Sequence, residues 1–207
     1  MSAPRVPLTE CAHWYAASAL FPGAIALDAT AGNGHDTLFL AAHVGPTGRV
    51  FAFDVQAAAL EATTARLQAA DHGEPLVDRV QLFQVDHSRF PEHLPARTQG
   101  EVAVVMFNLG YLPGGDKSQT TRGATTVIAL RHAVDWLRPG GLITVLAYPG
   151  HDAGAELTLL LSFLAALPEH IAWTEHEVAT ASSRSPRLFV LRKHDGERSP
   201  TGTRALA

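Results

Sequence analysis

The stretch ALDATAGNGHDT, residues 26–37, contains the strand-to-helix turn that decides the fold. An apolar run over residues 24–28 ends at Asp28, and a helical pattern follows the turn. Between them, Gly32 and Gly34 allow a tight turn and a close approach of the backbone to a ligand. A strand that leads through a glycine turn into a helix is the first unit of a doubly wound α/β sheet.

Outward from this turn, apolar runs alternate with helical patterns along the chain. Further strands are expected at residues 49–54, 80–85, 102–108, 142–148, 172–179 and 187–191. Helices are expected at residues 9–20, where Thr9 can supply the cap, and at 35–43, 56–71, 88–94, 123–137 and 153–167. Strands that are apolar on both faces and alternate with helices form a parallel sheet covered on both sides. The pattern predicts a doubly wound, Rossmann-like α/β fold.

Length and composition favour one domain, since the chain has 207 residues and is 46% hydrophobic. We assign residues 1–193 to this domain and expect residues 194–207, rich in Gly, Ser, Thr and Arg, to be a disordered tail. A net charge of −4 argues against a wholly basic nucleic-acid-binding protein but allows a local basic patch. Basic residues concentrate only at 184–204, where Arg184 and Arg187 either contact a polyanion or belong to a solvated end.

Cysteine, histidine and hydropathy patterns argue against several classes of protein. The single cysteine, Cys11, fits a reducing compartment, so we expect a cytoplasmic protein in which this thiol packs and is not a nucleophile. No apolar run approaches the ~20 residues of a membrane span, so no membrane partner is expected. The 11 histidines include no His-Glu-x-x-His motif and no Cys partner set, so no metal site is expected.

The polar residues of the quoted turn indicate its ligand. The turn reads D-x-T-x-G-x-G, and it differs from the dinucleotide fingerprint G-x-G-x-x-G by its leading acid and its missing third glycine. An acid at this position repels a diphosphate, but it can meet an ammonium group directly or through water. The cofactor that fits is S-adenosyl-L-methionine, which has a cationic amino acid end and no phosphate. Its contacts in this stretch are expected from Asp28, Thr30, Gly32, Asn33, Gly34, Asp36 and Thr37.

Two more acids end the next two strands. The second strand ends in FAFDVQ, which places Asp54 where an acid can accept hydrogen bonds from both ribose hydroxyls. The third strand ends in FQVDHS, so Asp86 can accept a hydrogen bond from the adenine amino group. Gln56 and His87 follow these acids and are included in the cofactor site, His87 as a neighbour and not as a direct ligand. The alternative, that the acids are ordinary helix caps or turn formers, applies most to Asp86.

The fourth strand ends in FNLGYLPGGDKSQTT, residues 107–121, which faces the methyl group of a cofactor bound in this way. The NLGY sequence resembles the Asn-Pro-Pro-Tyr type of motif of amino-group methyltransferases. This resemblance implies that Asn108 borders the cofactor and orients an amine acceptor, and that Tyr111 walls the acceptor pocket. The glycine pair after it lets the chain turn back, which brings Asp116 and Lys117 within reach. The alternative is a long turn stabilised by local hydrogen bonds.

The fifth strand ends in LAYPGH, so Tyr148 and His151 are expected beside the same pocket. An amine acceptor is protonated near neutral pH and must lose its proton before it attacks. Asp116 or His151 can accept this proton, although His151 can equally cap the next helix. Methyl transfer is an in-line displacement, so positioning and charge neutralisation supply most of its catalysis.

Three motifs together resemble the putative rRNA methylase family of class I S-adenosylmethionine-dependent methyltransferases. They are DATAGNGHDTLFLA, FNLGYLPGGDKSQTT and YPGHDAGAE, and the similarity runs from about residue 11 to residue 193. The resemblance implies a seven-stranded, mostly parallel sheet whose last strand is antiparallel. Better-understood members methylate 5-aminomethyl-2-thiouridine at the wobble position of tRNA, so tRNA is the expected partner. The resemblance also assigns Asp28, Asp54 and Asp86 to the cofactor, and Asn108, Tyr111, Asp116, Lys117 and His151 to the acceptor side.

Other functions stay open at this point. A small-molecule amine methyltransferase fits the acidic balance of charge, and another RNA, such as rRNA, would also suit the motifs. A non-catalytic RNA-binding module is a different class of protein, and Asn108 and the cofactor acids argue against it. The first helix, with Trp14 and Tyr15, is expected to pack into the core. Otherwise it could cover the cofactor or form the face of a homodimer.

Overall fold

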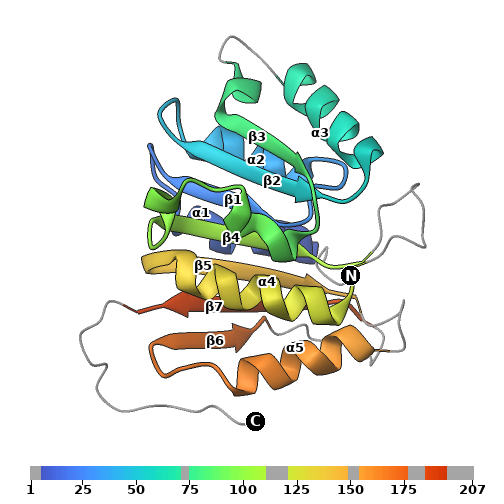
Figure 1. The fold of residues 1–207 in the computed structure, drawn as a ribbon, viewed down its shortest axis with the longest axis vertical. Helices are drawn as coiled ribbons and strands as arrows, with labels where there is room; N and C mark the ends of the chain where they lie inside the picture. Colours follow the sequence, from blue (N-terminus) through green and yellow to red (C-terminus); the bar gives the residue numbers. More distant parts are fainter. Residues whose placement is uncertain (1–5, 71–74, 111–120, 149–153, 177–184, 195–207) are drawn as a thin grey trace, which may run out of the picture.

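The computed structural model describes residues 6–70, 75–110, 121–148, 154–176 and 185–194, and within them seven strands form one sheet (Figure 1). The sheet order is β3-β2-β1-β4-β5-β7-β6. The strands are β1 (Ile25–Asp28), β2 (Arg49–Asp54), β3 (Val80–Gln84), β4 (Val102–Asn108), β5 (Leu137–Ala147), β6 (Ile171–Glu175) and β7 (Arg187–Lys193). β7 pairs antiparallel with β5 and β6, and the other neighbours pair in parallel. The predicted fold class, with its antiparallel last strand, is confirmed.

The position of β1 defines where a ligand can bind. β1 lies between β2 and β4, because the chain first adds strands on one side of β1 and then crosses to the other side. This reversal is a topological switch point, and the loops beyond the carboxyl ends of β1 and β4 diverge there. Residues 102–107 of β4 are all buried, as expected for a central parallel strand with helices on both faces.

Helices cover both faces of the sheet (Figure 1). α1 (Leu8–Ala17), α2 (His35–His43) and α3 (Ala57–Ala69) cover one face, and α4 (Gly123–Trp136) and α5 (Ala155–Ala165) cover the other. The described part of the chain also contains three 3-10 turns: η1 (Leu76–Arg79), η2 (His87–Glu92) and η3 (Ala96–Thr98). Each face has its own core. Cys11, in α1, is half-buried against the core on its side of the sheet, which agrees with a packing role.

The first helix differs from its prediction. It begins at Leu8, with Pro7 in the capping position, so the predicted Thr9 cap is wrong and Thr9 lies inside the first turn. Trp14 is 70% exposed and therefore does not pack into the core. Tyr15 is half-buried, and its hydroxyl lies 3.1 Å from His176 Nδ1. Only one side of a surface helix faces the sheet, and Trp14 lies on the other.

The bounds of other elements also differ from their predictions. β5 begins at Leu137 and not at residue 142, because Leu137 already pairs with Val102. The register then shifts before Leu142 pairs with Val104, and Gly140 in between has a positive φ. β6 covers Ile171–Glu175, shifted toward the N-terminus from its prediction, and residues 177–179 lie outside the described residues. The predicted helix at 88–94 is the 3-10 turn η2. Terminal residues are the least predictable part of any element.

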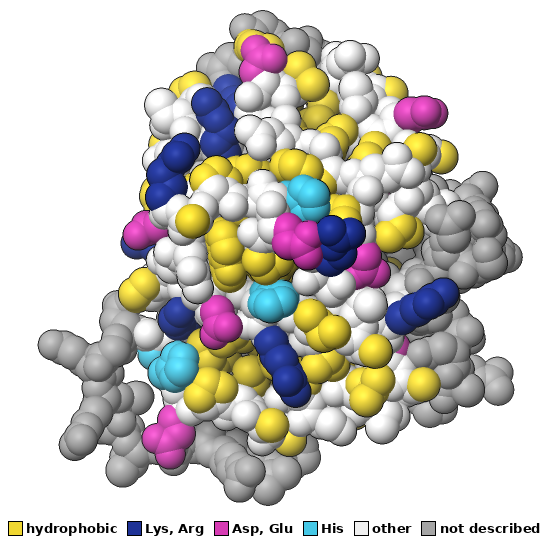
Figure 2. All heavy atoms as spheres, viewed as in Figure 1, with side chains coloured by type: hydrophobic (Ala, Val, Ile, Leu, Met, Phe, Trp, Pro, Cys, Tyr) yellow, Lys and Arg dark blue, Asp and Glu magenta, His cyan; other side chains and the backbone are white. Residues whose placement is uncertain are grey.

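No membrane-spanning helix occurs among the described residues, and the face that carries α4 and α5 shows no broad basic stripe in Figure 2. Within them, no helix is both long enough and apolar enough to cross a membrane. Figure 2 shows the face that carries α4 and α5, where Lys and Arg side chains are scattered among acidic and hydrophobic ones. This face therefore offers no continuous positive surface to a nucleic acid.

Candidate active site

The loop between β1 and α2, residues 29–34, is the predicted cofactor loop. The strands on both sides anchor it at the switch point. Ala29 donates its N–H to Met106 O of β4 at 2.9 Å, and Ala31 donates to Phe53 O of β2 at 2.9 Å. The loop therefore continues the sheet for a short distance before it turns into α2. Its backbone is positioned by the two strands whose ends were predicted to hold the cofactor and the acceptor.

Asp28, the acid that closes β1, is fully buried. Its carboxyl group accepts the Thr37 hydroxyl at 2.6 Å and the Thr30 N–H at 3.1 Å. Burial raises the pKa of Asp28 to about 7, and the charge of Asp36 adds to this, while the two hydrogen bonds work against it. A buried acid that titrates near neutral pH is well suited to meet a cationic ligand, which would favour its ionised form.

Asp54, at the end of β2, holds the glycine turn. One carboxylate oxygen accepts the Gly32 N–H at 3.0 Å and the other accepts the Gln56 N–H at 2.9 Å. Gly34 has a φ of +78°, and a Cβ there would lie 2.7 Å from the Cα of Thr63 in α3. Only glycine combines this left-handed conformation with such a close approach between α2 and α3.

The first turn of α2 forms a hydrogen bond with α1 that the sequence did not predict. His13 Nε2 of α1 lies 2.6 Å from Asp36 Oδ1, and the His13 ring stacks on Phe39 with centroids 4.1 Å apart. α1 therefore reaches the cofactor loop through His13. The other side of the loop is held by Arg66 of α3, which donates a hydrogen bond to Asn33 O. No motif links residues 13 and 36, so only the packing of α1 on the sheet brings them together.

Asp86, after β3, caps η2 by accepting the Ser88 N–H at 2.8 Å. Burial works to raise the pKa of Asp86, but hydrogen bonds from Ser88 outweigh it and hold that pKa below its usual range. The capping alternative is therefore realised in the structure. A carboxylate has several lone pairs, so the predicted contact with the adenine amino group is compatible with the cap and stays a prediction.

His87 is buried beside the same loop. Its Nδ1 lies 3.2 Å from Ala29 O, which makes Nδ1 the protonated nitrogen and leaves a lone pair on Nε2. Burial lowers the pKa of His87, so the ring is neutral at pH 7. Within the described part of the chain, Nε2 is a buried polar atom with no hydrogen-bond partner. Such an atom at a ligand site indicates a missing donor from a ligand or from water.

Three consecutive amides fix the end of β4. Asn108 donates its N–H to the Thr30 hydroxyl at 2.7 Å, and Leu109 donates to Leu146 O at 2.8 Å. Gly110 donates to the Thr121 hydroxyl at 2.9 Å. Asn108 is therefore tied by its backbone to the cofactor loop, which is the arrangement that a residue between cofactor and acceptor requires.

The ends of β5 and β7 lie at the same edge. Burial raises the pKa of Tyr148, and the charge of Asp36 adds to the effect. Arg187 is paired with Ala147 across the sheet, and its guanidinium forms a bidentate ion pair with Glu175. Its predicted contact with a polyanion would have to compete with that pair.

Several predicted residues cannot be placed, and one buried acid was missed. Tyr111, Asp116, Lys117, His151 and Arg184, all predicted for the acceptor side, lie outside the described residues. Glu156, in the first turn of α5, is 3% exposed and accepts hydrogen bonds from two threonine hydroxyls. Glu156 closes the motif YPGHDAGAE, but an acid near a helix start is common on protein surfaces, so the sequence gave no reason to expect burial.

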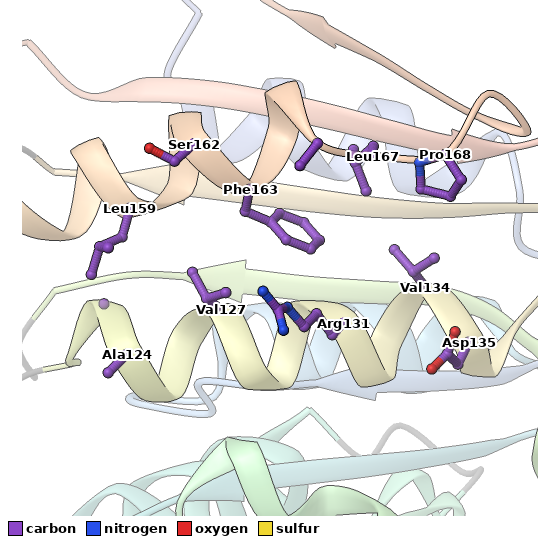
Figure 3. A pocket seen from close by; sticks show the side chains of 12 residues that line it. Ala124, Val127, Arg131, Val134, Asp135, Leu159, Ser162, Phe163, Leu167 and Pro168 are labelled. Atoms are coloured by element: carbon purple, nitrogen blue, oxygen red, sulfur yellow. The ribbon is translucent and has the colours of Figure 1, made fainter.

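A groove of about 630 Å³ runs between α4 and α5 on the outer face of these helices (Figure 3). Figure 3 shows apolar side chains facing one another across it, together with Arg131 and Asp135 of α4. None of the residues predicted for the cofactor or the acceptor lines it. No group of three or more His, Cys, Asp or Glu side chains that could hold a metal ion occurs among the residues that the structure describes. The candidate active site is therefore the carboxyl edge at the switch point.

Comparison with known proteins identifies the family. The family model described as "Putative rRNA methylase" matches residues 50–192, more than half of the chain. The chain belongs to this family. Its members are class I S-adenosylmethionine-dependent methyltransferases, and the sheet order found here has the antiparallel last strand of that fold.

Three relatives extend this family assignment. An Arabidopsis thaliana protein named tRNA (mnm(5)s(2)U34)-methyltransferase, chloroplastic, is 41% identical over 170 residues, 79% of this chain. The chain spans 61% of that relative's length. A crystal structure of a putative rRNA methylase from Clostridium thermocellum is 36% identical, with a TM-score of 0.83 over 93% of this chain and 100% of that one. A putative methyltransferase from Streptococcus mutans, solved in complex with SAH, is 29% identical, with a TM-score of 0.77 over 92% of this chain and 99% of that one.

The geometry at the switch point fits S-adenosylmethionine. The buried Asp28 carboxyl group offers a negative charge for an ammonium group, and the glycine turn offers close backbone approach. Asp54 and Asp86 end the neighbouring strands, and the buried Nε2 of His87 has no hydrogen-bond donor from the described residues. An acidic, glycine-lined edge suits a cationic cofactor that carries no phosphate better than a dinucleotide.

Proposed function

We propose that the chain transfers a methyl group from S-adenosyl-L-methionine to the nitrogen of an aminomethyl group on a modified wobble uridine of tRNA. The observation that carries this proposal is the Asn108 backbone, whose N–H is held by the Thr30 hydroxyl of the cofactor loop at 2.7 Å. This bond sets the residue predicted to orient the amine directly beside the residues predicted to hold the cofactor. The printed name of the 41% identical Arabidopsis relative supports the choice of substrate.

The cofactor-binding residues act mainly by charge and shape. When bound, the cofactor would supply an electrophilic methyl group on a positively charged sulfur. Asp28 would balance the charge of the amino acid end, Asp54 would accept the ribose hydroxyls, and Asp86 would accept the adenine amino group. Neutral His87 can accept a hydrogen bond through Nε2, which gives this buried lone pair a partner when the site is filled.

The acceptor side must orient a nitrogen lone pair. The Asn108 side-chain oxygen can accept a hydrogen bond from the amine, which directs the nitrogen lone pair toward the methyl group. The ammonium form of the acceptor would first have to lose a proton to free this lone pair, and methyl transfer would then leave the sulfur of the cofactor neutral. Asp116 or His151 is proposed to receive that proton, and Tyr111, Tyr148 and Lys117 to contact the nucleoside. This assignment needs no metal ion, since charge neutralisation comes from the cationic sulfur itself.

The proposed partner is tRNA, with Arg184 and Arg187 as backbone contacts. Net charge is −4, and the α4–α5 face carries no basic stripe in Figure 2, so we place the RNA at the carboxyl edge, beside Tyr148 and Arg187. A single half-buried cysteine is compatible with a reducing compartment, and we propose a cytoplasmic location. A homodimer through the exposed Trp14 side of α1 is also part of this proposal.

The proposal is tested by nucleoside mass spectrometry of tRNA from cells with and without the gene. The methylaminomethyl uridine should disappear in its absence, and the aminomethyl precursor should accumulate. Wild-type protein should restore the methylated nucleoside, and Asn108→Ala should not. In parallel, purified protein with labelled S-adenosylmethionine should label tRNA from the deletion strain, but not rRNA or a metabolite extract. Unchanged nucleoside levels, or label in either of the other fractions, would overturn the substrate assignment.

A further inference from the structure

A buried carboxyl group is connected by hydrogen bonds to the end of β4. Glu156 belongs to the first turn of α5, and it is 3% exposed. One of its oxygens accepts the Thr126 hydroxyl of α4 at 2.6 Å, and the other accepts the Thr121 hydroxyl at 2.8 Å. A buried carboxyl group is costly unless it is hydrogen-bonded, so this arrangement is a built feature of the α4–α5 contact.

The bond to Thr121 continues to the end of β4. A hydroxyl has one proton, and Thr121 donates it to Glu156, so its oxygen is left to accept. It accepts the Gly110 N–H at 2.9 Å, and the Thr121 N–H donates back to Gly110 O at 2.9 Å. Glu156 thereby sets the direction of the hydroxyl that holds Gly110.

A glycine makes this contact possible. Gly123 begins α4, and a Cβ at that position would lie 3.0 Å from the Cα of Glu156 and 2.8 Å from the Leu159 side chain. The first turns of α4 and α5 can therefore approach closely enough for short threonine–carboxylate bonds. The sequence did not predict this close approach, because residue 123 is at the start of α4 and residue 156 is near the start of α5.

We propose that Glu156 is a positioning residue that acts through Thr121 on the end of β4. The N–H groups of Asn108, Leu109 and Gly110 are held by three different elements, and Glu156 supports the third of these bonds. Loss of that bond loosens Gly110 and, through the backbone, the orientation of Asn108. The inference rests on the proposed function, because it assumes that Asn108 orients the acceptor.

Two threonines allow a matched test. Thr121→Val and Thr126→Val each replace a hydroxyl by a methyl group and each remove one hydrogen bond to Glu156. Only Thr121→Val removes the acceptor of the Gly110 N–H. Glu156→Leu removes the carboxylate and leaves the Thr121 hydroxyl in place. A positioning Glu156 predicts that Glu156→Leu behaves like Thr121→Val at the end of β4, whereas a purely structural Glu156 predicts that it behaves like Thr126→Val.

The measurements use the full chain. Amide hydrogen exchange by NMR should show the Gly110 N–H exchanging about tenfold faster or more in Thr121→Val, as expected when one buried hydrogen bond is lost, and near the wild-type rate in Thr126→Val. With tRNA, kcat should fall about tenfold or more in Thr121→Val and in Glu156→Leu but not in Thr126→Val, with cofactor affinity by calorimetry unchanged. Thr121→Ser keeps the hydroxyl and should restore both values.

The outcomes separate the two proposals. Equal Gly110 exchange in both valine variants overturns the positioning role of Glu156, whatever the enzyme acts on. Faster exchange without any loss of kcat also overturns it, because the end of β4 would then move without consequence. A wild-type protein that methylates no tRNA overturns the proposed substrate, while the exchange experiment still decides whether Glu156 holds Gly110. If Thr121→Val does not fold, Thr121→Ala and Thr121→Ser provide the same comparison.

Discussion

Asp28→Asn should make the protein more stable at pH 8 while it weakens cofactor binding. The asparagine side chain has nearly the shape and hydrogen-bonding capacity of a protonated Asp28, since its oxygen can accept the Thr30 N–H and its amide can donate to the Thr37 oxygen. The variant therefore keeps the local structure and removes only the titration. What it also removes is the negative charge that we propose for the ammonium group of the cofactor.

The magnitude follows from the pKa of Asp28, which burial raises from 3.8 to about 7. Between these values the unfolded chain releases its proton and the folded protein keeps it, so the free energy of unfolding falls as pH rises from about 4 to about 7. At about 1.4 kcal/mol per pH unit, the penalty is roughly 2 kcal/mol at pH 5 and roughly 4 kcal/mol at pH 8. The Asp28→Asn variant avoids this penalty, so its stability advantage should grow by roughly 2–3 kcal/mol between these pH values.

Urea denaturation of both proteins without cofactor, at pH 5 and pH 8, measures this difference. Calorimetry at pH 7.5 should show the variant binding S-adenosylmethionine at least about tenfold more weakly, as expected for a lost charged partner. Asp86→Asn is the control, because the pKa of Asp86 is shifted in the opposite direction, below its usual range. The stability that the Asp86 carboxylate contributes is therefore lost only in acid, below pH 5. Its stability relative to wild type should not change between pH 5 and pH 8. A constant difference for Asp28→Asn across the same range would refute the reasoning.

Three further predictions concern the same edge of the sheet. Asp54→Ala should weaken S-adenosylmethionine binding more than about tenfold, since charge-assisted hydrogen bonds contribute about 1.5–3 kcal/mol each, and unchanged affinity by calorimetry would reject the ribose contact. Asn108→Ala should lower kcat by about 10²–10³ with cofactor affinity retained, and near-normal turnover in a folded variant would defeat its catalytic role. Gly34→Ala should lower the free energy of unfolding by roughly 1–3 kcal/mol, because alanine is strained at φ +78° and its Cβ meets Thr63, and an unchanged melting temperature would show that α2 and α3 can separate freely.

The alternation of buried strands with helices, and the position of polar residues at strand ends, could be read directly from the sequence. Both are local signals, and parallel strands bring their carboxyl ends to one edge, so Asp28, Asp54 and Asn108 had to lie near one another. Helix boundaries were less predictable, since Pro7 and not Thr9 occupies the first capping position. The place of Trp14 on the outer side of α1 depended on how that helix rotates onto the sheet, which its own residues do not determine.

The sequence by itself determined the fold class, the glycine turn and the chemistry of the strand ends, because these depend on residues close together along the chain. The tertiary structure alone decided which groups are desolvated and which distant groups meet. The raised pKa of Asp28, the lone pair left on His87 and the His13–Asp36 pair all come from packing between separate elements. Glu156 is the clearest case: its environment is set by Gly123 and two threonines about 30 residues away, so an acid that looks solvated in sequence becomes a buried support for the end of β4.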